Sequence, residues 1–276
     1  NIYDAVAVVE VGVPYQLNFG RANYMLFSKD VAETGYISRF IDESFKNLGV
    51  RRSTKLMIVL GDSLDYCIGV VSKDNPNTSK RQYSILRDYV SEGLTPITNI
   101  AMFTQNVNAK RGDNIVTLGA TDDSIPNEEI TGSSQDSELN PNSTTAGVER
   151  TGGLRAYYMG CAVFDGGTMK GVLSGRDTEI ILMAKGMFRA GRLTLHHEGG
   201  EGHMVLLLKG GGKPKVELSI GGDAPYAKMS VRLQCHIECG EEDMDYNKWN
   251  QEVKPMLEDY MEPGEYRLHF LWKSGA

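Results

Sequence analysis

The stretch Leu17–Gly61 constrains the fold of this chain more than any other. An apolar run at Asn23–Ser28 precedes an amphipathic segment, and a second apolar run, Lys55–Leu60, follows it. Short apolar runs on either side of a helical pattern are typical of a strand, a helix and a second strand. In such a βαβ unit the strands are parallel and the crossover is right-handed. The sequence therefore predicts a βαβ unit near the N-terminus.

The segment between these strands carries its own start and stop signals. Ser28 is suited to cap the helix, and Gly49 is suited to end it. Gly35 lies inside the helical pattern and predicts a break into two shorter pieces. The apolar residues that follow it recur at helical spacing, namely Ile37, Phe40, Ile41, Phe45 and Leu48.

The length of 276 residues favours two or three domains, because single cores rarely grow beyond this size. The turn cluster Asp74–Asn77 marks a first boundary. We expect an incomplete N-terminal α/β domain at 1–75, a middle α+β domain at 76–188 and a C-terminal α+β domain at 189–276. Residues 121–153 are polar and poor in aromatic side chains, which predicts a mobile acidic loop. The fold class is α+β, multidomain, with mixed β-sheets flanked by helices.

Within the middle domain, Asn99–Val107 and Ile115–Leu118 are interpreted as strands. The pair Tyr157–Phe164 and Thr168–Leu173 flanks an Asp-Gly-Gly turn and predicts a hairpin. Asp177 is expected to cap a following helix.

Glycine-rich turns in the C-terminal domain favour a meander, and a helix and a last strand are expected after it. The four strands expected in the meander are Arg192–His197, His203–Lys209, Lys215–Ile220 and Ser230–Cys239; the later helix covers 249–260 and the last strand 266–272.

The charge and composition exclude several classes of protein. A net charge of −7 and a pI near 5.3 argue against a nucleic-acid-binding surface, which would be basic. No apolar run approaches the roughly 18 residues of a membrane-spanning helix. Four Cys are too few and too scattered for a disulfide framework. No glycine-rich phosphate loop is present, and we expect no cofactor.

The sequence Gly-Asp-Ser-Leu at Gly61–Leu64 resembles the nucleophile block of the GDSL esterases. Those enzymes activate the Ser with a His that is held by an Asp three residues earlier. None of the five His has an Asp at that position, and no block for an oxyanion donor is present. We therefore expect no catalytic residue and predict that Asp62 or Ser63 caps a helix. A serine hydrolase that uses Ser63 is the alternative.

Several His and Cys near the C-terminal end have the side chains that zinc prefers. Cys235 and His236 are adjacent in a predicted strand, so they point to opposite faces, and the same holds for His196 and His197. The cysteines fall on the apolar face, where they serve as small core residues. We therefore expect no metal site among His196, His197, His203, Cys235, His236 and Cys239.

Two stretches resemble the Ger(x)C family, the C subunits of spore germinant receptors. In the first, the matching residues are Leu17–Gly20, Tyr24–Ser28, Ala32–Gly35 and Arg51. In the second they are Gly160–Phe164, Met169–Leu173, Thr178–Glu179 and Leu182–Gly186.

The resemblance implies three α+β domains without a known active site. It implies an extracytoplasmic lipoprotein, anchored in the inner spore membrane through an N-terminal Cys that carries lipid such as palmitate. The partners would be the integral-membrane A and B subunits of the receptor. The sequence departs from this pattern in three ways: it has no lipobox Cys, an abbreviated C-terminal helical region at about Tyr246–Met261, and the acidic insert. We expect a trimmed chain that acts by protein–protein contact in nutrient-triggered germination, and not an enzyme.

Overall fold

The computed structural model describes residues 2–14, 16–70, 78–109, 114–121, 156–196, 203–210, 213–219, 226–231, 233–239 and 251. The chain divides into two compact units, which are described separately. Unit 1 comprises Asn1–Val90 and Leu94–Thr178, and unit 2 comprises Ser91–Gly93 and Glu179–Ala276. The expected domain boundaries after residues 75 and 188 remain predictions.

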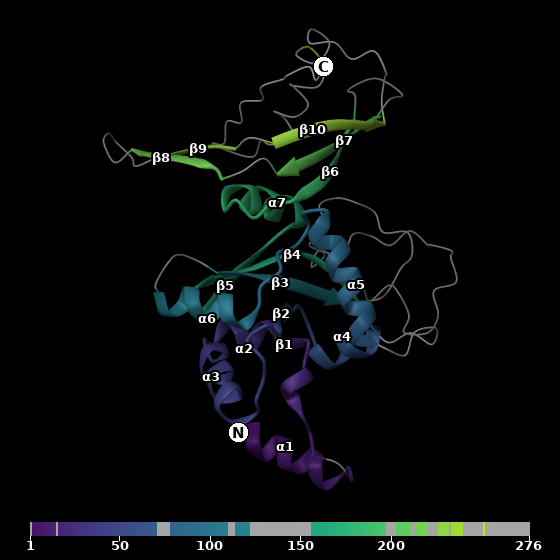
Figure 1. The fold of residues 1–276 in the computed structure, drawn as a ribbon, viewed down its shortest axis with the longest axis vertical. Helices are drawn as coiled ribbons and strands as arrows, with labels where there is room; N and C mark the ends of the chain where they lie inside the picture. Colours follow the sequence, from purple (N-terminus) through teal and green to yellow (C-terminus); the bar gives the residue numbers. More distant parts are fainter. Residues whose placement is uncertain are drawn as a thin grey trace. The chain divides into compact units, whose positions relative to one another are not determined.

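Unit 1 is built on a five-stranded mixed sheet with the strand order β1-β2-β3-β4-β5 (Figure 1). Strands β1, β2 and β3 are parallel, whereas β4 is antiparallel to both of its neighbours. The expected mixed sheet and the expected hairpin β4–β5 are therefore confirmed. The strands are β1 (Tyr24–Ser28), β2 (Lys55–Val59), β3 (Asn114–Thr121), β4 (Ala156–Asp165) and β5 (Thr168–Leu173).

The predicted βαβ unit is present, and its helical part is broken where the sequence indicated. Helix α2 (Lys29–Glu33) and helix α3 (Ile37–Asn47) join β1 to β2. Gly35 separates them with φ +76°, and Gly49 follows α3 with φ +63°. Both angles lie in the left-handed region that glycine adopts without strain.

Helices cover both faces of the sheet. Helices α2, α3 and α6 (Ile100–Ala109) lie on one face, and α4 (Ser63–Gly69) and α5 (Thr78–Ser91) lie on the other (Figure 1). Successive side chains of β2 point alternately to the two faces of the sheet. Leu56 and Ile58 pack toward α3, whereas Met57 and Val59 pack toward α4 and α5. Burial on both faces explains why β2 is a continuous apolar run.

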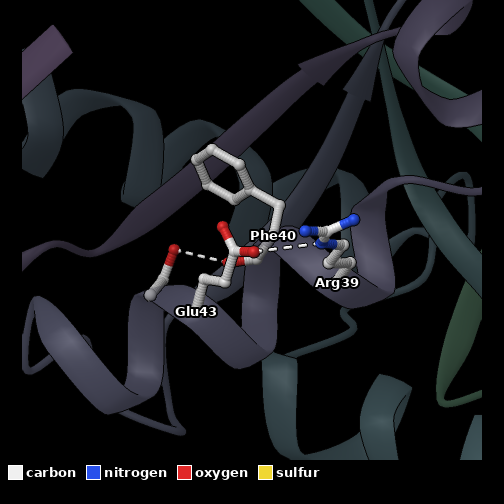
Figure 2. A network of polar contacts seen from close by, with 4 residues as sticks. Arg39, Phe40 and Glu43 are labelled. Carbon is white, nitrogen blue, oxygen red and sulfur yellow. Dashed lines mark hydrogen bonds and ion pairs between the residues drawn. The ribbon is translucent and has the colours of Figure 1, made fainter. Parts of the chain in front are cut away.

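Helix α3 has an outer polar edge and an inner apolar edge. Arg39 Nε donates a hydrogen bond to Glu43 Oε1 at 3.1 Å, one turn along the helix, as Figure 2 shows. The ring of Phe40 is turned away from this ion pair and meets the ring of Phe27 in β1 edge-on, with 5.2 Å between ring centroids. The amphipathic pattern of the sequence thus corresponds to a helix that packs its apolar face on the sheet and exposes its polar face to solvent.

The expected strand at Asn99–Val107 is wrong, because these residues form helix α6. Ile100 and Phe103 are fully buried, and Val107 packs against the same core. These positions are separated by three and four residues, which is helical spacing. Asn99 begins the helix, since its side-chain oxygen accepts a hydrogen bond from Met102 N at 2.9 Å.

Helix α7 (Gly175–Ala184) begins earlier than expected, and Asp177 is not its cap. Ser174 is the cap, because its hydroxyl oxygen accepts a hydrogen bond from Asp177 N at 3.1 Å and donates one to Asp177 Oδ2 at 2.7 Å. Gly186, with φ +65°, follows the helix as expected.

Unit 2 contains a three-stranded antiparallel sheet in the order β10-β7-β6 and a separate hairpin, β8–β9. The expected four-strand meander is therefore wrong. Strand β9 is not among the expected strands; it pairs with β8, and β7 pairs with β10. The strands are β6 (Ala190–His196), β7 (His203–Gly210), β8 (Lys215–Ser219), β9 (Tyr226–Ser230) and β10 (Leu233–Cys239).

Two further elements precede the sheet of unit 1: helix α1 (Ile2–Val11) and a 3₁₀ turn at Phe19–Arg21. The expected loop at 121–153, apart from its first residue, and the later helix and strand at 249–260 and 266–272, apart from residue 251, lie outside the described residues.

Candidate functional site

The corner after β2 is a helix cap in the structure. Asp62 Oδ1 accepts hydrogen bonds from Leu64 N at 2.6 Å and Asp65 N at 3.3 Å. This confirms the prediction that the Gly-Asp-Ser-Leu sequence caps a helix, with Asp62 as the cap and Ser63 as the first helical residue. All five His of the chain lie in unit 2, so the unit that contains Ser63 has none. Within unit 1, the base that a GDSL-type triad requires is therefore missing.

The His and Cys considered as zinc ligands lie in or beside the strands of unit 2. Cys235 in β10 is half-buried and its neighbour His236 is exposed, as the predicted alternation requires. His196 and His203 are paired across β6 and β7, and His197 lies outside the described residues. Among the described residues there is no group of three or more side chains that is arranged to hold a metal ion.

The sheet face under α4 and α5 carries a cluster of aromatic side chains that the sequence analysis did not find. We call Tyr24 of β1, Tyr66 of α4 and Tyr158 of β4 the tyrosine cluster. Tyr66 and Tyr158 lie edge to face with 6.2 Å between ring centroids, and Tyr89 of α5 lies equally far from Tyr158. Tyr66 and Tyr158 are almost completely buried, with exposures of 0% and 1%.

The hydroxyl groups of the tyrosine cluster are buried, and none of the three has a hydrogen-bond partner. Burial raises the pKa of Tyr158 to about 12 and raises the pKa of Tyr24 and Tyr66 as well. The hydroxyls of Tyr66 and Tyr158 are close enough for each to affect the pKa of the other, although neither completes a hydrogen bond of ordinary geometry. All three are therefore neutral phenols with a hydrogen to donate.

A positive charge lies next to this cluster. The ammonium of Lys55 lies 5.4 Å from the ring centroid of Tyr24 and 4.8 Å from that of Tyr83 in α5. Partial burial lowers the pKa of Lys55. Among the described side chains, no carboxylate forms an ion pair with Lys55. A cation held only by aromatic faces lacks a counter-ion.

The three hydroxyls can donate hydrogen bonds, and the ammonium of Lys55 favours a negative charge beside them. The walls around the three hydroxyls are apolar and include Met57, Val59 and Leu86. In such surroundings a polar group without a partner costs about 1–3 kcal/mol. The three phenols of the cluster can each donate a hydrogen bond to an acceptor.

The comparisons with known proteins cover both halves of the chain. A family model described as "Spore germination protein N-terminal domain" matches residues 1–119. A second, described as "Spore germination B3/ GerAC like, C-terminal", matches residues 159–263. Together they account for most of the chain, in the order in which the two domains are named. The chain belongs to the Ger(x)C family of germinant receptor C subunits. The predicted resemblance is thereby confirmed.

A solved structure agrees with the fold of this family member. The "Crystal Structure of the GerBC protein" is similar with a TM-score of 0.56 at 12% sequence identity, over 91% of this chain. At this identity the similarity shows the fold alone, and it confirms the multidomain α+β class. The chain spans 63% of the length of that structure. A comparison with curated protein sequences finds no match.

The chain thus contains both named domains of this spore germination family. None of the described helices is both long enough and apolar enough to cross a bilayer.

Proposed function

We propose that this protein is a non-catalytic, lipid-anchored C subunit that acts by protein–protein contact in nutrient-triggered germination. The observation that carries the proposal is the pair of family models, which match residues 1–119 and 159–263 in the expected order. The partners are the integral-membrane A and B subunits of the receptor, and the place of action is the outer surface of the inner spore membrane.

The attachment to the membrane is a lipid on a Cys upstream of Asn1. One acyl chain gives only marginal and reversible binding, so stable attachment needs a second chain or a second contact. A diacylated Cys supplies the second chain. With one acyl chain alone, the partner subunits supply the second contact.

Helix α1 offers the described surface that best suits the contact with partner subunits. Val8, Val9 and Val11 are exposed to 73%, 50% and 90%. Val8 and Val11 are three residues apart and share one side of the helix. Neighbouring exposed apolar side chains are a feature of surfaces that bind other proteins. We infer that this valine surface of α1 packs against the extramembrane part of an A or B subunit.

The test replaces Val8 and Val11 together by Ser in the full-length protein. Burial of two valines at an interface contributes about 1.5–3 kcal/mol for each side chain, so their loss weakens binding at least tenfold. The measurement is co-purification of the A and B subunits with this protein from detergent-solubilised spore membranes, together with the germination rate of the spores.

Val31→Ser is the matched control, because Val31 in α2 is also exposed, to 38%, and lies outside α1. The proposal predicts that the control retains its partners while the double variant loses them. Equal recovery of both subunits with the two variants contradicts the assignment of α1 as the contact surface. Failure to recover either subunit with the wild-type protein contradicts the proposed mechanism as a whole.

A further inference from the structure

We propose that the tyrosine cluster is a binding site for a small monocarboxylate. The proposal does not depend on the proposed function, since it rests on the side chains of unit 1 alone.

The first argument is the convergence of donors. Tyr24, Tyr66 and Tyr158 come from three different elements, and all three hydroxyls are shielded from solvent without a partner. Buried hydroxyls in folded proteins nearly always have a hydrogen-bond partner. Three buried hydroxyls without one in the same cluster therefore indicate that a bound group supplies the acceptor. Hydrogen bonds among the three hydroxyls themselves do not remove the need for a further acceptor. Three phenols carry three hydrogens, and a chain of three hydroxyls uses only two of them.

The second argument is the charge. The ammonium of Lys55 stands over the rings of Tyr24 and Tyr83, at 5.4 and 4.8 Å from their centroids, with no carboxylate paired to it among the described residues. Three neutral donors beside one unpaired cation are complementary to an anion with acceptor atoms.

The third argument selects the kind of anion. The surrounding side chains are apolar, so a ligand with two charges pays a prohibitive desolvation cost, whereas one charge is balanced by Lys55. A carboxylate carries one charge and has about four acceptor positions, enough for the three hydroxyls. Its short alkyl group suits the neighbouring Met57 and Val59. The geometry therefore favours a small organic acid over a phosphate or sulfate.

Gly119 of β3 shapes this site. A Cβ at position 119 would lie 2.9 Å from Tyr66 Cε2 and 3.3 Å from the sulfur of Met57. Only a glycine lets the ring of Tyr66 reach down to the sheet, where its hydroxyl joins those of the other two tyrosines.

The experiment uses sodium acetate as the probe and sodium chloride at equal ionic strength as the reference. The thermal unfolding midpoint of the whole chain is followed as a function of each salt, together with the near-UV absorption of tyrosine. The proposal predicts a saturable rise in midpoint with acetate beyond that with chloride. Acetate at about 100 times its Kd raises the folding equilibrium constant about 100-fold.

Tyr158→Phe and Lys55→Met are the informative variants, and both are expected to lose the acetate response. Removal of a hydroxyl that has no partner leaves no other buried group unsatisfied, so Tyr158→Phe is expected to fold. Tyr36→Phe is the control, because Tyr36 is 41% exposed and lies on the other face of the sheet beside α3; it keeps the response.

Three results overturn the proposal. The first is an equal midpoint of the wild type in acetate and chloride. The second is a saturable effect of chloride as large as that of acetate, which assigns the site to simple halide ions. The third is an acetate response that survives in Tyr158→Phe or Lys55→Met, which places acetate elsewhere on the molecule.

Discussion

Gly119 lies directly against the ring of Tyr66, so closely that a Cβ at position 119 would stand 2.9 Å from Tyr66 Cε2. The ring is fully buried, and the Cβ would also lie 3.2 Å from Tyr66 Cζ and 3.3 Å from the sulfur of Met57. We therefore expect Gly119→Ala to lower the free energy of unfolding by about 1–3 kcal/mol, the usual cost of overpacking a core. Chemical denaturation of the whole chain measures the change.

Gly171→Ala in β5 is the control for this substitution. A Cβ at position 171 meets no atom within 4 Å, so the added methyl group is tolerated. The expected change is within about 0.5 kcal/mol. If both variants lose the same stability, the loss comes from the strand backbone, and the close packing of Gly119 on Tyr66 is not its cause.

Phe103 of α6 is a central residue of the core on the other sheet face. It is fully buried and meets Phe164 of β4 edge to face, with 5.3 Å between ring centroids. Phe103→Ala is expected to cost about 3–5 kcal/mol of unfolding free energy, because it leaves a cavity in a packed core. Met102→Ala, next to it on the exposed side of the helix, is expected to cost about 0.5 kcal/mol or less. The reverse order of the two effects contradicts the burial of Phe103 in this core.

The side chain of Asp62 is expected to contribute to the free energy of unfolding, and that of Ser63 is expected to make no measurable contribution. Asp62→Ala removes the acceptor of two backbone N–H groups and is expected to cost about 0.5–2 kcal/mol, whereas Asp62→Asn retains most of the cap. Ser63→Ala leaves the cap intact. We also expect short-chain ester turnover to be equally negligible in the wild type and in Ser63→Ala. A turnover that disappears with Ser63 establishes the hydrolase and refutes a purely structural corner.

Tyr158 makes stability depend on pH in the alkaline range. Its pKa is about 12 in the folded protein, mainly because it is buried, against 10.0 when exposed. Between these values the unfolded chain has lost the proton and the folded chain keeps it, so the free energy of unfolding falls as pH rises. The contribution of Tyr158 to the free energy of unfolding is fully present below pH 10.0 and is lost by about pH 12. Between these values it falls by about 1.4 kcal/mol per pH unit.

Tyr158→Phe removes the contribution of Tyr158 to this dependence, whereas the contributions of Tyr24 and Tyr66 remain. Denaturation curves at about pH 9 and about pH 11.5 are sufficient to show the difference. The wild type is expected to lose more stability between these two values than the variant does. A parallel loss in both proteins shows that Tyr158 does not retain its proton in the folded state.

The sequence alone predicts the elements that are specified locally. Gly35 and Gly49 mark the ends of the two helical pieces of the βαβ unit, and Asp62 marks the cap of α4, because each signal acts within a few residues. Ser28 lies at the N-cap position of α2, but its side chain makes no capping hydrogen bond. The Asp-Gly-Gly turn predicts the β4–β5 hairpin in the same way. These residues also include much of what identifies the Ger(x)C family.

The remaining features depend on contacts that are distant along the chain. The helical spacing of Ile100, Phe103 and Val107 was present in the sequence, but apolar runs of this length also suit a strand, and the sheet face decides between them. The tyrosine cluster joins residues 24, 66 and 158, which no local pattern connects. The pairing of β7 with β10 in place of β8 is likewise a choice between strands with similar composition.

The central claim is that this Ger(x)C protein works as a non-catalytic receptor subunit, and nutrient-triggered germination of spores tests it most directly. Spores that lack the gene are compared with spores complemented by the wild type or by Ser63→Ala, and germination is followed by the loss of optical density. The account predicts that deletion abolishes the response to nutrient and that both genes restore it equally. Normal germination of the deletion spores, or restoration by the wild type alone, contradicts it.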